Sequence, residues 1–127
     1  MRSASEAAVG PRVAMFLALS LLGLIGLLLP LPDSATWLRW LLNIAHLPLF
    51  AAWASLLLGV WLAVRGHRHA LLAAACLGIC AALGSEGLQA LQPSRFVDAR
   101  DAFSNVAGVG LGLAFGRWRW REQFAAP

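Results

Sequence analysis

The chain has 127 residues, of which 60% are hydrophobic and only 13% are charged. Soluble domains carry about 25% charged residues, so this composition excludes an ordinary water-soluble protein, which would expose large apolar patches and aggregate. The net charge of +4 comes from ten arginines and six acidic residues. The arginines lie in short clusters beside the apolar runs and form no extended basic stripe, which argues against nucleic-acid binding.

Four apolar segments are long enough to cross a membrane, and together they account for most of the chain. Crossing the hydrocarbon core takes about 20 helical residues, and backbone groups in lipid must be paired within the segment, which favours helices. We therefore predict an all-α integral membrane bundle of four transmembrane helices, built as a single domain over residues 1–127. The expected spans are about 12–29, 41–64, 70–91 and 98–116.

The first span follows Arg2 and Arg12, and it resembles a signal peptide. Its apolar run is longer than the roughly 7–15-residue core of such peptides, and Pro30 and Pro32 end it. Residues 33–35 make a poor cleavage site, so we favour a first helix that is retained, with cleavage as the alternative.

The second and third spans are joined by a polar turn at residues 65–69. Pro48 follows His46 early in the second span, and the backbone hydrogen bond that proline removes predicts a kink there. The third span carries Cys76 and Cys80, which we interpret as small core-facing residues. Two thiols without a nearby His or Asp do not predict a metal site, and we expect no cofactor.

The fourth span places its polar residues and its glycines on one helical stripe about 80° wide. The stripe consists of Asp98, Asp101, Asn105, Gly108, Gly112 and Gly116. Glycines four residues apart let a neighbouring helix approach closely. We therefore expect the three glycines to form the packing face and the carboxylates to point into the bundle.

The arginines also predict the orientation, because cytoplasmic ends of spans carry an excess of basic residues. Seven of the ten arginines fall on the side of both termini, and only Arg39, Arg95 and Arg100 fall on the other. Both termini are therefore expected in the cytoplasm. The absence of lysine beside abundant Ala, Leu and Arg suggests a GC-rich bacterial genome, so the membrane would be the bacterial inner membrane.

Polar residues of three spans would then meet near the outer membrane face. The candidate catalytic residues are His46, Glu86, Arg95, Asp98 and Asp101, and the binding or structural network around them adds Gln89, Asn105 and Arg100. Ionisable groups inside a membrane need partners, so we expect Arg95 to pair with Glu86 or Asp98. Such a network either locks the helices together or supplies groups that bind or act on a polar headgroup.

This region resembles the VanZ-like family of membrane proteins over about Leu41–Gly116. The resemblance rests on Glu86-x-x-Gln89, Pro93, Arg95, Asp98, Asp101, Asn105, Gly108 and Gly112, together with His46 at the start of the second span. The family often has Asp-Lys where this chain has Leu42 and Asn43, which weakens any role for charges beside His46. The resemblance implies an envelope function, and resistance to teicoplanin follows from the family name only.

Two functions remain open at this point. The first is binding of an envelope lipid, a lipid-linked precursor or a partner protein through the outer pocket. The alternative is an enzyme acting on a lipid-linked phosphate, with His46 or Glu86 as the acid–base residue, Arg95 holding the anion, and Asp98 and Asp101 orienting the network or holding a divalent metal. A transporter is disfavoured, because four short helices leave little room for alternating access.

Overall fold

The computed structural model describes residues 4–28, 36–91 and 99–125, and these ranges consist of helices and short turns without any strand. The helices are α1 (Ala4–Leu28), α2 (Thr36–Arg65), α3 (Ala70–Ala90), α4 (Ala99–Arg119) and the short α5 (Arg121–Ala125). The prediction of an all-helical protein is confirmed. The first two helices start earlier than the expected spans, and α1 includes Pro11.

Three of the described helices are long and apolar enough to cross a membrane. Their apolar stretches are Val9–Gly26 in α1, Ile44–Arg65 in α2 and Ala70–Ala90 in α3. The fourth long helix, α4, has the same length as α3 but begins with Arg100 and Asp101 and ends with Arg117 and Arg119. Its charged ends make it less apolar than the other three.

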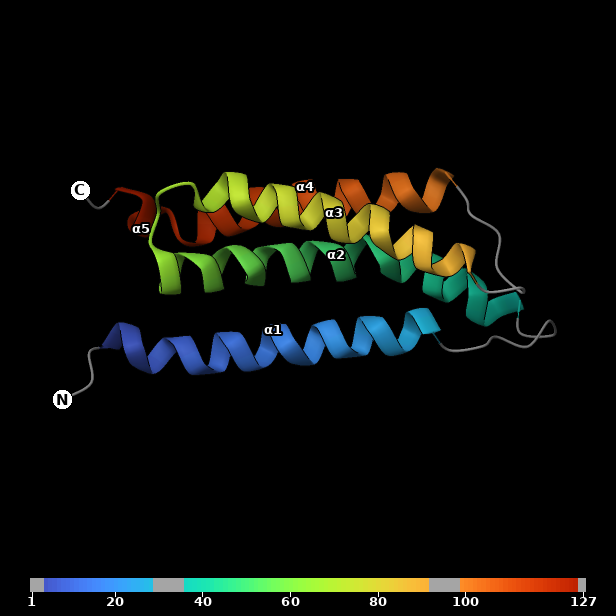
Figure 1. Ribbon diagram of the computed structural model, residues 1–127, viewed down its shortest axis with the longest axis horizontal. Coiled ribbons are helices and arrows are strands. Elements are labelled where there is room, and N and C mark those ends of the chain that lie inside the picture. The colour runs from blue at the N-terminus through green and yellow to red at the C-terminus, as the bar shows by residue number, and fades with distance from the viewer. Residues whose placement is uncertain (1–3, 29–35, 92–98, 126–127) are drawn as a thin grey trace.

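The long helices lie side by side, with α2 between α1 and the pair formed by α3 and α4 (Figure 1). The core lies among α2, α3 and α4, where Leu58 and Val109 are fully or almost fully buried. No residue of the apolar stretch of α1 is buried within the chain. Helix α1 is thus attached to the side of a three-helix core.

Glycines of α4 set how closely this helix packs on α2. A Cβ atom added at Gly112 would overlap the backbone of Ala51, and one added at Gly108 would lie 2.5 Å from the carbonyl oxygen of Leu47. Gly116 is also buried, and its Cβ would lie 3.1 Å from a methyl group of Leu58. The backbones of α2 and α4 therefore touch along a face that has no side chains on the α4 side.

The buried face of α3 also consists of small residues. Ala74, Gly78 and Ala82 are spaced four apart on it, and a Cβ added at Gly78 would lie only 2.7 Å from Val109 of α4. Cys76 and Cys80 lie on the other side of this helix and are exposed. The expectation that they face the core is therefore wrong, because the alanine and glycine positions already occupy the buried side.

A hydrogen bond and an aromatic contact at Trp53 help to hold α1 on α2. The indole Nε1 of Trp53 donates a hydrogen bond of 2.8 Å to the hydroxyl of Ser20, which donates its own proton to the carbonyl of Phe16. The rings of Phe16 and Trp53 are 5.2 Å apart. Because both hydroxyl functions of Ser20 are used, the bond fixes the position of α1 along α2.

Substitution of Trp53 by phenylalanine should loosen α1. The variant keeps most of the ring contact but loses the hydrogen bond, which in a membrane contributes about 0.6 kcal/mol and at most about 1.7 kcal/mol. The measurement is the unfolding midpoint in a detergent titration. Trp61→Phe is the matched control, since the buried Nε1 of Trp61 has no hydrogen-bond partner among the described residues. Equal midpoint losses in both variants would contradict the role of the bond.

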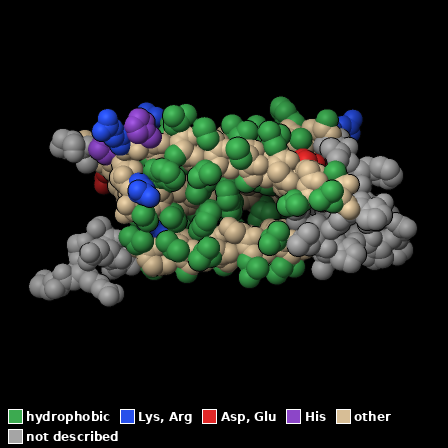
Figure 2. Space-filling model, viewed as in Figure 1, with side chains coloured by type: hydrophobic (Ala, Val, Ile, Leu, Met, Phe, Trp, Pro, Cys, Tyr) green, Lys and Arg blue, Asp and Glu red, His purple; other side chains and the backbone are tan. Residues whose placement is uncertain are grey.

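The two chain ends and the turn between α2 and α3 lie at one end of the molecule (Figure 1). That turn needs left-handed backbone at Gly66, with φ of 77°, and at His69, with φ of 59°. The guanidinium of Arg12 lies 5.6 Å from the ring centroid of Trp120, which joins the start of α1 to the end of α4. Basic side chains gather at this same end (Figure 2).

Candidate functional site

A buried polar network joins α3 to α4 near the end opposite to the basic one. The side-chain nitrogen of Asn105 donates hydrogen bonds to Glu86 Oε1 at 2.7 Å and to Ser85 Oγ at 3.2 Å. The hydroxyl of Ser85 donates in turn to the carbonyl of Ala82 at 2.7 Å. Glu86 is 5% exposed and Asn105 is fully buried. One amide thus holds a carboxylate inside the bundle.

The sequence positions this network through the packing of small residues. Asn105 lies on the same side of α4 as Gly108 and Gly112, so the close approach to α2 keeps its side chain inside the bundle. The contact between Gly78 and the side chain of Val109 keeps α3 close to α4 one turn after Asn105. A short amide can bridge two helices only at such a distance.

The network leaves two buried polar atoms without a hydrogen-bond partner among the described residues. They are the donor Nε2 of Gln89 and the acceptor Oδ1 of Asn105. Gln89 is only 3% exposed and lies one turn after Glu86 on the buried side of α3. Unsatisfied buried groups carry a cost of about 1–3 kcal/mol each. One donor and one acceptor at the network are therefore unpaired within the described part of the chain.

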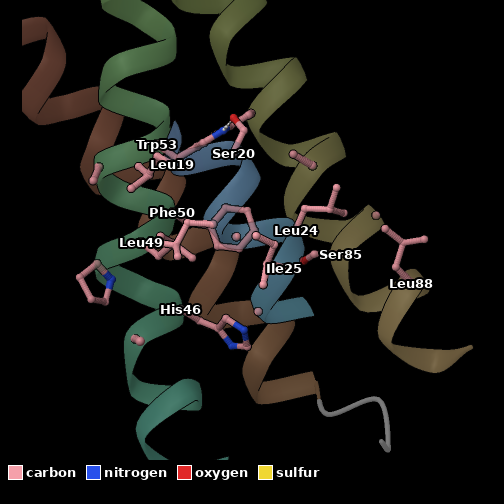
Figure 3. A pocket seen from close by; sticks show the side chains of 18 residues that line it. Leu19, Ser20, Leu24, Ile25, His46, Leu49, Phe50, Trp53, Ser85 and Leu88 are labelled. Carbon is pink, nitrogen blue, oxygen red and sulfur yellow. Dashed lines mark hydrogen bonds between the residues drawn. The ribbon is translucent and has the colours of Figure 1, made fainter. Parts of the chain in front are cut away.

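A large apolar cavity lies on the other side of α3, bounded by α1, α2 and α3, with a volume of about 1120 Å³. Its walls are mostly aliphatic and aromatic, as Leu24, Leu49, Phe50 and Leu88 illustrate (Figure 3). The close-up places His46 at the end away from Trp53 and Ser20 (Figure 3). His46 thus marks the polar end of an otherwise hydrophobic space.

Ser85 belongs both to the polar network and to the wall of this cavity. Its hydroxyl proton is donated to Ala82, and Ser20, which also lines the cavity, donates its proton to Phe16. Both hydroxyls therefore offer only an acceptor function to anything in the cavity. Among the described cavity-lining residues, His46 is the one with an ionisable side chain.

The remaining candidate residues divide into two groups. Arg100 is exposed and Asp101 half-buried at the start of α4, and Asp101 lies one turn before Asn105. Arg95 and Asp98 lie outside the described residues, and so does the expected pairing of Arg95 with Glu86 or Asp98. The described part of the chain contains no group of three His, Cys, Asp or Glu side chains arranged to hold a metal ion.

Reasoning from the sequence missed Ser85 and the cavity. Ser85 was visible as the neighbour of Glu86, although nothing in its spacing showed that it contacts both α4 and the cavity. The cavity had one sequence signal, which was the set of glycines at Gly23, Gly26 and Gly84 that leave its walls without side chains. These glycines alone could not locate the cavity, because its walls form only when α1 packs against α2 and α3.

No protein-family model matches the chain, and no curated protein or solved structure shows a significant match to it.

Proposed function

We propose that this protein is a four-span, VanZ-like protein of the bacterial inner membrane that binds an envelope lipid or a lipid-linked precursor near the extracytoplasmic face. The observation that carries the proposal is the position of Ser85. This residue connects a buried network containing a carboxylate to an apolar cavity with His46 at its end. An amphiphile needs this combination of a polar and an apolar compartment.

The distribution of side chains on α4 supports its assignment as the fourth span. Its polar residue Asn105 is fully buried, whereas Phe103, Leu111 and Phe115 are between 56% and 75% exposed. A helix with buried polar groups and exposed large hydrophobic groups is suited to lipid and not to water. The charged residues lie in its first and last turns, at the depth of the membrane interfaces.

The basic end of the bundle supports cytoplasmic termini. It carries six described arginines, which are Arg12, Arg65, Arg68, Arg117, Arg119 and Arg121. Trp118 and Trp120 lie at this end, and Trp37 and Trp40 lie at the opposite end of the bundle, as expected for aromatic residues at the two interfaces.

A reporter fused after Pro127 tests this orientation. We expect a fusion to a fluorescent protein that folds only in the cytoplasm to be bright, and a fusion to alkaline phosphatase to be inactive, because basic residues are retained on the cytoplasmic side. The converse pattern would contradict the orientation. It would also place the polar network on the cytoplasmic side of the membrane.

A lipid panel separates binding from turnover. Purified protein is incubated with phosphatidylglycerol, phosphatidylethanolamine and a polyprenyl phosphate, and the lipids are then extracted and analysed by mass spectrometry. We expect a bound lipid to be recovered unchanged. Recovery of a dephosphorylated or transferred product would favour an enzyme acting on a lipid-linked phosphate, with His46 and Glu86 as the first residues to substitute. Absence of binding to all three lipids would contradict the proposal.

A further inference from the structure

The cavity between α1, α2 and α3 lies entirely within the apolar stretches of these helices. Its lining residues come from 19–26 of α1, 45–53 of α2 and 81–88 of α3. These segments run through the hydrocarbon part of a bilayer if the helices span it. The molecules surrounding the cavity are then lipid chains and not water.

A space of this size and composition needs an occupant other than water. Its volume of about 1120 Å³ exceeds the roughly 300–1,000 Å³ of pockets for drug-sized ligands. Water enters a cavity only where it finds two to four polar partners, and the described lining offers such groups mainly at His46 and Ser85. Protein interiors are close-packed without large voids, so we expect hydrocarbon to fill an apolar cavity of this size in a membrane.

The shape of the cavity indicates which part of a lipid it takes. On α3 the lining runs from Ala81 to Leu88, a stretch of eight residues that spans about 10 Å of helix rise. The cavity therefore extends along the helices for only about a third of the roughly 30 Å hydrocarbon core of a bilayer. It accommodates the part of the hydrocarbon chains next to a headgroup, with the rest of the chains extending into the bilayer.

We propose that this cavity binds the headgroup-proximal hydrocarbon of a membrane lipid, which enters sideways between α1 and α3. The inference rests on the proposed lipid-binding function and adds that the hydrocarbon chains of the lipid lie in this cavity. His46 and Ser85 lie where the chains join the headgroup, and Ser85 connects this point to the network of Asn105 and Glu86. The surface is hollowed between α1 and the neighbouring helices (Figure 2).

The polarity of the cavity walls agrees with a headgroup placed at the His46 end. From His46 the cavity runs along α2 toward Trp53, whose indole N–H is already bound to Ser20. That end therefore offers no donor to a ligand from Trp53, and Ser20 has already donated its proton. The polar part of an amphiphile therefore finds better hydrogen-bonding partners at the His46 end of the cavity. Its hydrocarbon chains would lie toward the Trp53 end.

Glycines of α3 provide a matched pair of test variants. Gly84 lines the cavity and Gly87 does not, and a Cβ added at either position would meet no atom within 4 Å. Both residues are exposed and both lie in α3. Gly84→Leu therefore adds a side chain at the cavity wall where its Cβ meets no other atom, and Gly87→Leu adds the same side chain to the same helix outside the cavity.

The experiment uses the full chain in vesicles of phosphatidylethanolamine and phosphatidylglycerol that contain a photoactivatable phosphatidylglycerol. The probe carries a diazirine in the headgroup-proximal part of one acyl chain. A parallel arm uses a polyprenyl phosphate labelled at the same depth, which distinguishes phospholipid from isoprenoid chains. Labelled peptides are identified by mass spectrometry. Total bound lipid is measured separately, by native mass spectrometry.

We expect the wild type and Gly87→Leu to be labelled on the cavity segments of α1 and α3. Labelling of Gly84→Leu should be about tenfold weaker. This is the effect expected when about two methylene groups of the lipid chain lose their contact with the cavity wall. Labelling of Gly84→Leu at the wild-type level, or labelling spread evenly over exposed faces of the bundle, would overturn the inference. If lipid is still bound in that case, the proposed function survives. If no lipid is bound to the wild type, the proposed function fails with it.

Discussion

Substitution of Gly112 by alanine should destabilise the protein by about 1–3 kcal/mol, the range for adding a methyl group to a packed interior. The added Cβ would overlap the backbone of Ala51 in α2. A backbone cannot rotate away as a side chain does, so the two helices must separate. The separation would also displace Asn105, which lies two turns earlier on the same side of α4. The unfolding midpoint in a detergent titration measures the loss.

Gly110→Ala is the matched control for this prediction. Gly110 is exposed in the same helix, and a Cβ there would meet no atom within 4 Å. Alanine is favoured over glycine in a helix by up to about 1 kcal/mol, so this variant should be neutral or slightly stabilised. If both variants behaved alike, the close contact between α2 and α4 would be wrong.

Substitution of Asn105 by leucine should have the largest effect among the polar residues. It removes two hydrogen bonds at once and leaves Glu86 inside the bundle without the donor at 2.7 Å. A hydrogen bond to a charged group contributes about 1.5–3 kcal/mol to stability, and the bond to Ser85 is lost as well. We expect strongly reduced membrane abundance and a lower unfolding midpoint.

Glu86→Gln separates charge from hydrogen bonding in this network. Glutamine has nearly the same shape as glutamate, and its amide oxygen still accepts the hydrogen bond from Asn105. The free energy of unfolding of the variant should therefore stay within about 1 kcal/mol of the wild type. A loss in Glu86→Gln as large as that in Asn105→Leu would show that the negative charge itself holds the helices. A negligible effect of Asn105→Leu would show that the network contributes nothing to the bundle.

The sequence contained most of the information for the helices and for the contact face of α4. Uninterrupted apolar runs and the prolines between them predicted where helices form, because lipid permits little else. The spacing of Gly108, Gly112 and Gly116 predicted a face without side chains, and in the structure this face contacts α2. Asn105 lies on the same stripe, which is why its place inside the bundle could be foreseen.

Other features depended on how helices distant in sequence dock. The bond between Trp53 and Ser20 joins residues 33 positions apart, and no periodicity in either helix selects that pair. The orientation of α3 was ambiguous, because small residues occur on both of its sides, and Cys76 and Cys80 were placed on the wrong one. The cavity exists only once α1 is in place, so no single helix predicts it.

Native mass spectrometry of the purified protein, extracted from its host membrane in mild detergent, tests the central claim most directly. His46 lines one end of the cavity, whereas His67 is exposed in the turn at the basic end of the bundle. His46→Ala and His67→Ala therefore form a matched pair. We expect the wild type and His67→Ala to retain a lipid of defined mass, and His46→Ala to retain about tenfold less, equivalent to about 1.4 kcal/mol. Equal retention by all three proteins, or no retained lipid in the wild type, would contradict a lipid site built on the polar residues of α2, α3 and α4.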